Sequence, residues 1–117
     1  MINDVEKAIR DYLPDIIHMS LATSVGNQPW LCEVHYVYDD DLNFYFRSLE
    51  SRRHSQEIER NPNVAGSIVT QHSTTDKPRG IFFTGKAEKM INVSDKDPAY
   101  LQYCKRFGTD SSILDEA

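Results

Sequence analysis

The chain has 117 residues, of which 39% are hydrophobic and 26% charged, and its formal net charge at pH 7 is -5. This size and composition are typical of one soluble globular domain, so residues 1–117 are expected to form a single domain. No apolar run approaches the ~20 residues that cross a bilayer. The negative charge argues against a general nucleic-acid or anionic-membrane surface, and we expect neither partner.

The cysteines and the first residues bear on the cellular compartment. Cys32 and Cys104 are far apart and show neither metal-ligand nor Cys-x-x-Cys spacing, so reduced thiols are expected. Residues 1–6 lack the basic and apolar regions of a secretory signal. Together these features favour a cytoplasmic protein.

The N-terminal half is predicted to form a helix and three strands. Apolar residues at helical spacing predict a helix over residues 4–13, with Asn3 as its cap and Pro14 as its end. Runs of β-branched and aromatic residues with short polar or Gly-containing links then favour an antiparallel meander. Its strands are predicted at residues 16–24, 30–38 and 42–48, with turns at 25–29 and 39–41.

The second half is predicted to contain two helices and two strands. The helices are expected at 51–60, with Ser51 as the N-cap, and after Asp97-Pro98, with Gly108 as the C-terminal cap. The strands are expected at 64–70 and 79–91. The order helix, three strands, helix, two strands, helix favours a mainly β small barrel with flanking helices.

Two arginines stand at the start of the predicted helix over residues 51–60. A helix N-terminus carries a partial positive charge, so Arg52 and Arg53, with nearby Arg47, make a local positive site that favours an anion. Arginine forks, the Ser51 hydroxyl and free backbone N–H groups are donors suited to a phosphate. The sequence therefore predicts a site for a phosphorylated cofactor.

A less specific interpretation of the same arginines stays open. They could form a solvated basic face that pairs with nearby carboxylates, because surface ion pairs are common. The candidate carboxylates are Asp39, Glu50, Glu57 and Glu59. His54 is expected to lie on the helix surface.

The strand over residues 30–38 carries large side chains on both faces, which favours burial on both sides and a subunit interface. Glu33 and His35 share one face and could form an acid–base or metal pair, but no third ligand has a supporting spacing, so no metal site is predicted. His18 and His72 have no partner that the sequence identifies. No catalytic residue is assigned; His35 is the first candidate for an acid or base.

Five segments of the sequence, in order, resemble the pyridoxamine 5′-phosphate oxidase-like, FMN-binding split-barrel family. The likeness covers more than half of the chain. The matching segments are Gln28-Pro29 before a strand, Phe44-Tyr45-Phe46-Arg47, Ser51-Arg52-Arg53, the stretch from Glu59 to Val64, and the stretch from Arg79 to Glu88.

The resemblance implies a homodimer of split β-barrels with FMN at the subunit interface. Arg47, Arg52 and Arg53, with Ser48 and Ser51 beside them, would contact the flavin phosphate. Four strand residues, Glu33, Val34, His35 and Tyr36, would border the isoalloxazine ring, and Gly80 would approach from the other subunit. The implied chemistry is hydride transfer between the flavin and a small-molecule substrate.

The chain also departs from the true oxidase. After the last matching strand, the oxidase carries Tyr and Arg one helical turn apart; here Tyr100 is followed by Cys104 at that position. An Arg-x-His element near the C-terminus and a further strand, both typical of the family, have no match in this sequence. We therefore expect a relative with another substrate.

Three rivals stay open from the sequence. The same basic cluster could hold a deazaflavin or a haem, or the protein could bind FMN without catalysing a reaction, or it could be a structural dimer with no cofactor. A fold does not by itself decide among them.

Overall fold

The computed structural model describes residues 4–70, 73–75, 79–90 and 97–107. Asn3, His72, the predicted strand end at Ile91, and Gly108 lie outside the described residues. The helices are α1 (Asp4–Tyr12), the 3-10 turn η1 (Leu13–Asp15), α2 (Arg53–Arg60) and α3 (Pro98–Phe107). The strands are β1 (His18–Val25), β2 (Gln28–Tyr38), β3 (Phe44–Phe46), β4 (Asn63–Ile68) and β5 (Ile81–Lys86).

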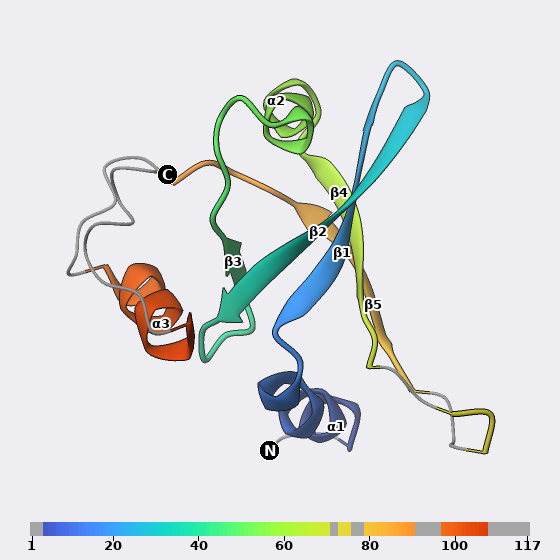
Figure 1. The fold of residues 1–117 in the computed structure, drawn as a ribbon, viewed down its shortest axis with the longest axis vertical. Coiled ribbons are helices and arrows are strands. Elements are labelled where there is room, and N and C mark those ends of the chain that lie inside the picture. Colours follow the sequence, from blue (N-terminus) through green and yellow to red (C-terminus); the bar gives the residue numbers. More distant parts are fainter. Residues whose placement is uncertain (1–3, 71–72, 76–78, 91–96, 108–117) are drawn as a thin grey trace.

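The predicted order of helices and strands is confirmed, and the fold is mainly β. The strands form one antiparallel sheet in the order β3-β2-β1-β4-β5, which curls into a half-barrel. Helix α2 lies at one end of the sheet, α1 at the other, and α3 beside β2 and β3 (Figure 1). Among the described residues, no helix is both long enough and apolar enough to span a membrane.

The β1–β2 hairpin turns on two residues. Gly26 and Asn27 have φ angles of 59° and 62°, which is the left-handed pair that a tight two-residue hairpin turn requires. The strands therefore pair without interruption from Val25 opposite Gln28 to His18 opposite His35. The predicted five-residue turn was too long, because Gln28 and Pro29 belong to β2.

The core fills the concave side of the sheet. Its buried side chains are Leu13, Ile16, Met19, Leu21, Val34, Tyr36 and Ile68. Each such side chain stabilises the fold by roughly 1.5–3 kcal/mol through removal of apolar surface from water. Successive residues along each strand alternate between this inner face and the outer face. Part of the outer face is covered near α3, where Val37 is buried and His35 stacks on Phe107.

Two predicted strands are shorter than expected. The third strand loses its first residues because the Asp39 carboxylate accepts hydrogen bonds from the backbone N–H groups of Asp41 and Asn43 and organises a turn. Leu42 takes a φ of 61° within it. These hydrogen bonds lower the pKa of Asp39, and the bond from the Asn43 N–H has the largest effect. The fifth strand ends at Lys86. The prediction that it continues toward residue 91 was therefore wrong for residues 87–90.

Helix α3 begins as predicted. The Asp97 carboxylate oxygen accepts a hydrogen bond from the Ala99 N–H at 3.0 Å, and Pro98 is the first helical residue. Near the other end, the Arg106 guanidinium donates to the backbone oxygens of Leu13, Ile16 and Tyr36. This side chain fixes α3 to the junction between η1 and β1.

Candidate functional site

Helix α2 begins two residues later than predicted. Arg52, with φ -68° and ψ 146°, occupies the N-cap position, and its side chain makes no capping hydrogen bond. The assignment of Ser51 as N-cap was therefore wrong; Ser51 is exposed in the turn before the helix. The first helical bond runs from Gln56 N–H to Arg52 O at 3.1 Å. The preceding N–H groups, at residues 53–55, have no partner within the helix.

Arg52 is the available cation at this helix start. Its side chain is exposed, and among the described parts of the chain it makes neither a hydrogen bond nor an ion pair with another side chain. The helix dipole adds partial positive charge at the same point. The N-terminal end of α2 can therefore bind an anion through Arg52 and through backbone N–H groups.

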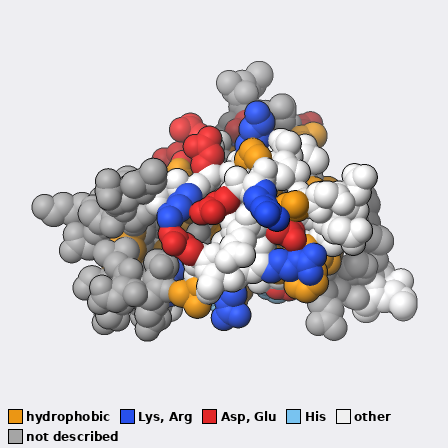
Figure 2. All heavy atoms as spheres, turned by 90° about the horizontal axis from the view of Figure 1, so that it is seen from above, with side chains coloured by type: hydrophobic (Ala, Val, Ile, Leu, Met, Phe, Trp, Pro, Cys, Tyr) orange, Lys and Arg blue, Asp and Glu red, His pale blue; other side chains and the backbone are white. Residues whose placement is uncertain are grey.

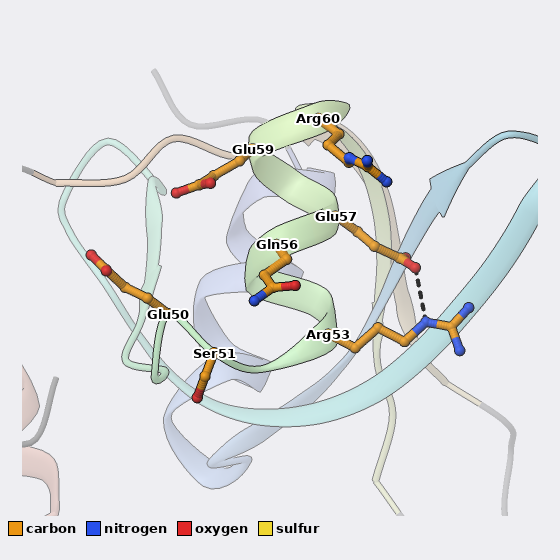
Figure 3. A pocket seen from close by; sticks show the side chains of 7 residues that line it. All are labelled: Glu50, Ser51, Arg53, Gln56, Glu57, Glu59 and Arg60. Carbon is orange, nitrogen blue, oxygen red and sulfur yellow. Dashed lines mark hydrogen bonds and ion pairs between the residues drawn. The ribbon is translucent and has the colours of Figure 1, made fainter.

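Arg53 has a different role. Its Nε donates to Glu57 Oε2 at 2.8 Å, and its guanidinium carbon lies 4.1 Å from the centre of the Trp30 ring. Thr23 donates a second hydrogen bond to Glu57, at 2.6 Å. The bond from Thr23 and then the contact with Arg53 lower the pKa of Glu57. For Arg53, the structure thus shows the carboxylate pairing that the less specific interpretation described (Figure 3).

The prediction for His54 was wrong, because this side chain is buried rather than on the surface. Its Nε2 lies 2.6 Å from the Ser48 hydroxyl oxygen, and Ser55 donates to the same oxygen at 3.2 Å. Burial, and then the charge of Arg52, lower the pKa of His54. Ser48 therefore holds the start of α2 against the end of β3. An exposed His would be expected on so polar a helix, but the side-chain contacts with Phe46 and Ser48 help to bury it.

Arg47 and Ser48 connect β3 to the α2 turn. The register that pairs Tyr36 with Phe46 places Arg47, one residue further on, beside His35 of β2. Both Arg47 and Ser48 are half-buried. The predicted phosphate residues therefore lie in one segment, which runs along the edge of the sheet to the start of α2.

The four predicted ring-contacting residues of β2 divide between two faces. Val34 and Tyr36 are buried in the core, so their side chains face away from any ligand on the outer face. Glu33 and His35 are exposed on the outer face, where Glu33 accepts a hydrogen bond from Ser20. Only Glu33 and His35, together with the backbone of this segment, are available to a bound ring.

Gly80 lies at the opposite edge of the sheet. It comes just before β5, which is the edge strand furthest from β3 in the strand order, and it is exposed. The strand order therefore places Gly80 and Arg47 at different edge strands, although the curl of the sheet brings Phe44 of β3 and Phe83 of β5 to 5.4 Å between ring centres. The approach of Gly80 from a second subunit stays a prediction of the family resemblance.

A hollow of about 780 Å³ lies beside α2. Its lining residues are Glu50, Ser51, Arg53, Gln56, Glu57, Glu59 and Arg60. Basic and acidic side chains alternate over this end of the molecule (Figure 2). Positive charge therefore does not extend continuously over this face. Within the described ranges, no three His, Cys, Asp or Glu side chains converge as metal ligands.

Sequence comparison assigns the family. No family model matches the chain. The UPF0306 protein plu4501 of Photorhabdus laumondii is 32% identical over 106 residues, a match that covers 90% of this chain and 73% of the relative. The chain belongs to the UPF0306 family. A UPF0306 protein of Yersinia pestis is 30% identical over 90 residues, and there the match spans only 60% of the relative's length.

Two solved structures share the fold. HutZ, described as the heme storage protein from Vibrio cholerae, superposes with a TM-score of 0.72 at 18% identity, over 95% of this chain and 79% of HutZ. The conserved hypothetical protein Rv2991 from Mycobacterium tuberculosis gives 0.71 at 19% identity, over 99% of this chain and 72% of Rv2991. The predicted split-barrel fold of this UPF0306 protein is thereby confirmed.

Proposed function

We propose that this UPF0306 protein binds FMN as a cytoplasmic homodimer, with the flavin phosphate at the N-terminal end of α2. The observation that carries this proposal is the exposed Arg52 at an N-cap that no side chain caps. A phosphate there would accept hydrogen bonds from the first backbone N–H groups and neutralise the arginine. Arg53 is the second, weaker contact, because Glu57 already holds it.

The donor set fits a phosphate ester. Arg52 supplies a planar fork, Ser51 supplies an exposed hydroxyl, and the helix supplies oriented N–H groups. Arg47 lies on the edge of the sheet between this point and His35. A flat ring attached to the phosphate could then extend along β2 toward Glu33 and His35.

A second copy of the chain would complete such a site. Leu31 and Phe82 are 62% and 77% exposed on the outer face of the sheet. Ala22 pairs with Leu31 and with Ala65, and the β5 partner of Ala65 is Thr84, two residues from Phe82, so small side chains lie between these two large apolar ones. An apolar surface of this kind is typical of a protein–protein interface. We propose that the outer faces of two protomers meet here and that Gly80 of one borders the cofactor of the other.

Bound FMN would supply the capacity for hydride transfer, and the protein would supply binding and orientation. The proposed reaction class is therefore an oxidoreductase acting on a small molecule. His35, exposed beside the proposed ring position, is the candidate proton donor or acceptor. A protein that only holds FMN would show the same binding but no turnover with any electron donor.

FMN titration, followed by quenching of flavin fluorescence, tests the proposal. Wild type should bind FMN, and Arg52→Gln should weaken binding by about tenfold or more, because one charge-assisted hydrogen bond contributes about 1.5–3 kcal/mol. Arg60→Gln is the matched control, since Arg60 lies at the other end of the same helix. Equal losses in both variants, or no FMN binding by wild type, would refute the site.

Haem is the second candidate, favoured by the shared fold with the heme storage protein HutZ. The same arginine could pair with a haem carboxylate, so the Arg52 variant does not separate the two cofactors. Absorption spectra do, because haemin produces a strong near-ultraviolet band on binding whereas FMN absorbs in the blue. A deazaflavin would be recognised by its own absorption and fluorescence.

A further inference from the structure

His18 and His35 face each other across the β1–β2 hairpin. They are direct partners in the register. The Tyr36 N–H donates to Ile17 O at 3.2 Å, so the neighbouring pair of Ile17 and Tyr36 is the hydrogen-bonded one. His18 and His35 therefore form a non-hydrogen-bonded pair, in which the Cα atoms are about 4.5 Å apart and the side chains are closest.

The surroundings of the pair leave both imidazoles available. Both residues are exposed on the outer face. The His35 ring stacks on Phe107 of α3, with 4.9 Å between ring centres and 25° between planes, which restricts its rotation. Figure 1 shows α3 beside the end of β2 that carries His35. The negative Glu33 lies next along the same face, where it accepts a hydrogen bond from Ser20.

We propose that His18 and His35 together bind a divalent transition-metal ion such as Zn²⁺ or Cu²⁺. Two imidazoles on directly opposed strand positions can each place one nitrogen at the ~2.0–2.1 Å distance that Zn²⁺ prefers. Imidazole suits Zn²⁺ and Cu²⁺, whereas Mg²⁺ and Ca²⁺ prefer oxygen ligands. In the described part of the chain no third protein ligand converges on the pair, so water or a small ligand fills the remaining positions.

The metal site shares His35 with the proposed position of the flavin ring, but it does not use the phosphate contacts, because neither Arg52 nor α2 takes part in it. The sequence places His35 on the same strand face as Glu33. Its imidazole neighbour, His18, comes from the preceding strand, and that pairing depends on the hairpin register. The tight turn at Gly26 and Asn27 sets that register.

Calorimetric titration with Zn²⁺, and electron paramagnetic resonance with Cu²⁺, test the site. Wild type should bind one ion per chain, and Cu²⁺ should show nitrogen hyperfine coupling from two imidazoles. His18→Gln and His35→Gln should each weaken binding by at least tenfold and leave at most one coupled imidazole.

His35→Gln also removes the ring contact with Phe107 and could lower the stability of the fold. His18→Gln does not touch that contact, so it tests metal binding on its own. Arg52→Gln, which weakens the proposed phosphate site, should leave Zn²⁺ binding unchanged, so the two proposals can fail separately. Undiminished binding by the double variant H18Q/H35Q would overturn the proposal. So would spectra that show only one coordinated imidazole in wild type.

Discussion

The guanidinium carbon of Arg53 lies 4.1 Å from the centre of the Trp30 ring, and this contact joins the β1–β2 hairpin to the start of α2. Glu57, one turn further along the helix, accepts hydrogen bonds from Arg53 and from Thr23 of β1. Arg53 thus fixes the helix to the hairpin. The adjacent Arg52 makes no such contact and is exposed. Arg53 therefore has a structural role, whereas Arg52 can bind a ligand.

The Glu57 contacts predict a specific dependence of stability on pH. The pKa of Glu57 lies below its usual 4.5 in the folded protein. The contribution of Glu57 is therefore present above pH 4.5 and is lost as the pH falls through the folded pKa. Glu57→Gln should reduce the slope of the free energy of unfolding between about pH 6 and about pH 3, measured by urea denaturation.

Glu59→Gln is the control for that experiment, because it removes a carboxylate from an exposed position on the same helix. It should leave most of the slope in place. Thr23→Val, which removes the hydroxyl that donates to Glu57 at 2.6 Å, should resemble Glu57→Gln. An unchanged slope in both Glu57→Gln and Thr23→Val would contradict the role assigned to this carboxylate.

Gly66 predicts a packing effect. A Cβ atom at position 66 would lie 2.2 Å from Cζ of Phe83, so Gly66→Ala would force the Phe83 ring away from its place against Phe44. Overpacking of this kind costs about 1–3 kcal/mol. Thermal and urea denaturation should show this loss in Gly66→Ala.

Gly85→Ala is the matched control, because it lies on the adjacent strand and a Cβ there would meet nothing within 4 Å. The double variant G66A/F83L should recover part of the loss, since it removes the ring that clashes. If Gly66→Ala and Gly85→Ala were equally stable, the close contact with Phe83 would not be a determinant of packing.

The local parts of this fold could be predicted from the sequence, and the long-range parts could not. Asp97-Pro98 and Gly26-Asn27 act through neighbouring backbone groups, so their effect is visible in a short window. The pairing of Ser20 with Ser67 joins distant strands, and no local signal specifies it. The strand order in the sheet therefore had to come from the structure.

The candidate site shows the same division. Its positive residues could be identified because they cluster within a few positions of one helix start. Which arginine is free could not be predicted, because Glu57 and Trp30 reach Arg53 from different elements. Likewise, burial of His54 depends on Ser48 and Phe46, which a helical periodicity argument does not include.

Arg106 predicts how firmly α3 is attached. Its guanidinium donates to three backbone oxygens, at Leu13, Ile16 and Tyr36, and stacks 4.8 Å from the Tyr36 ring centre. Hydrogen bonds that involve a charged group contribute about 1.5–3 kcal/mol each. Without the guanidinium, these three backbone oxygens would lose the hydrogen bonds that Arg106 donates to them. Arg106→Met should therefore lower the free energy of unfolding by at least about 2 kcal/mol, measured by urea denaturation.

Lys105→Met, at the exposed neighbouring position of α3, should change that free energy far less. The comparison separates the geometry of the guanidinium from the loss of one positive charge. Arg106→Lys keeps the charge but has no planar fork, so it should fall between wild type and Arg106→Met. A result in which both methionine variants are equally stable would contradict the anchoring role.

Phe82 tests the proposed contact between two copies of the chain. This side chain is 77% exposed on the outer face, so Phe82→Asp should leave the protomer folded and should place a charge in the interface. Burying an uncompensated carboxylate is strongly unfavourable, so the dimer should dissociate. Light scattering should show the wild-type mass of two chains fall to that of one, with an unchanged far-ultraviolet circular dichroism spectrum. Val5→Asp, at a site 70% exposed on α1, is the control and should stay dimeric. A Phe82→Asp dimer as strong as wild type would place the interface elsewhere, and a monomeric wild type would refute the interface.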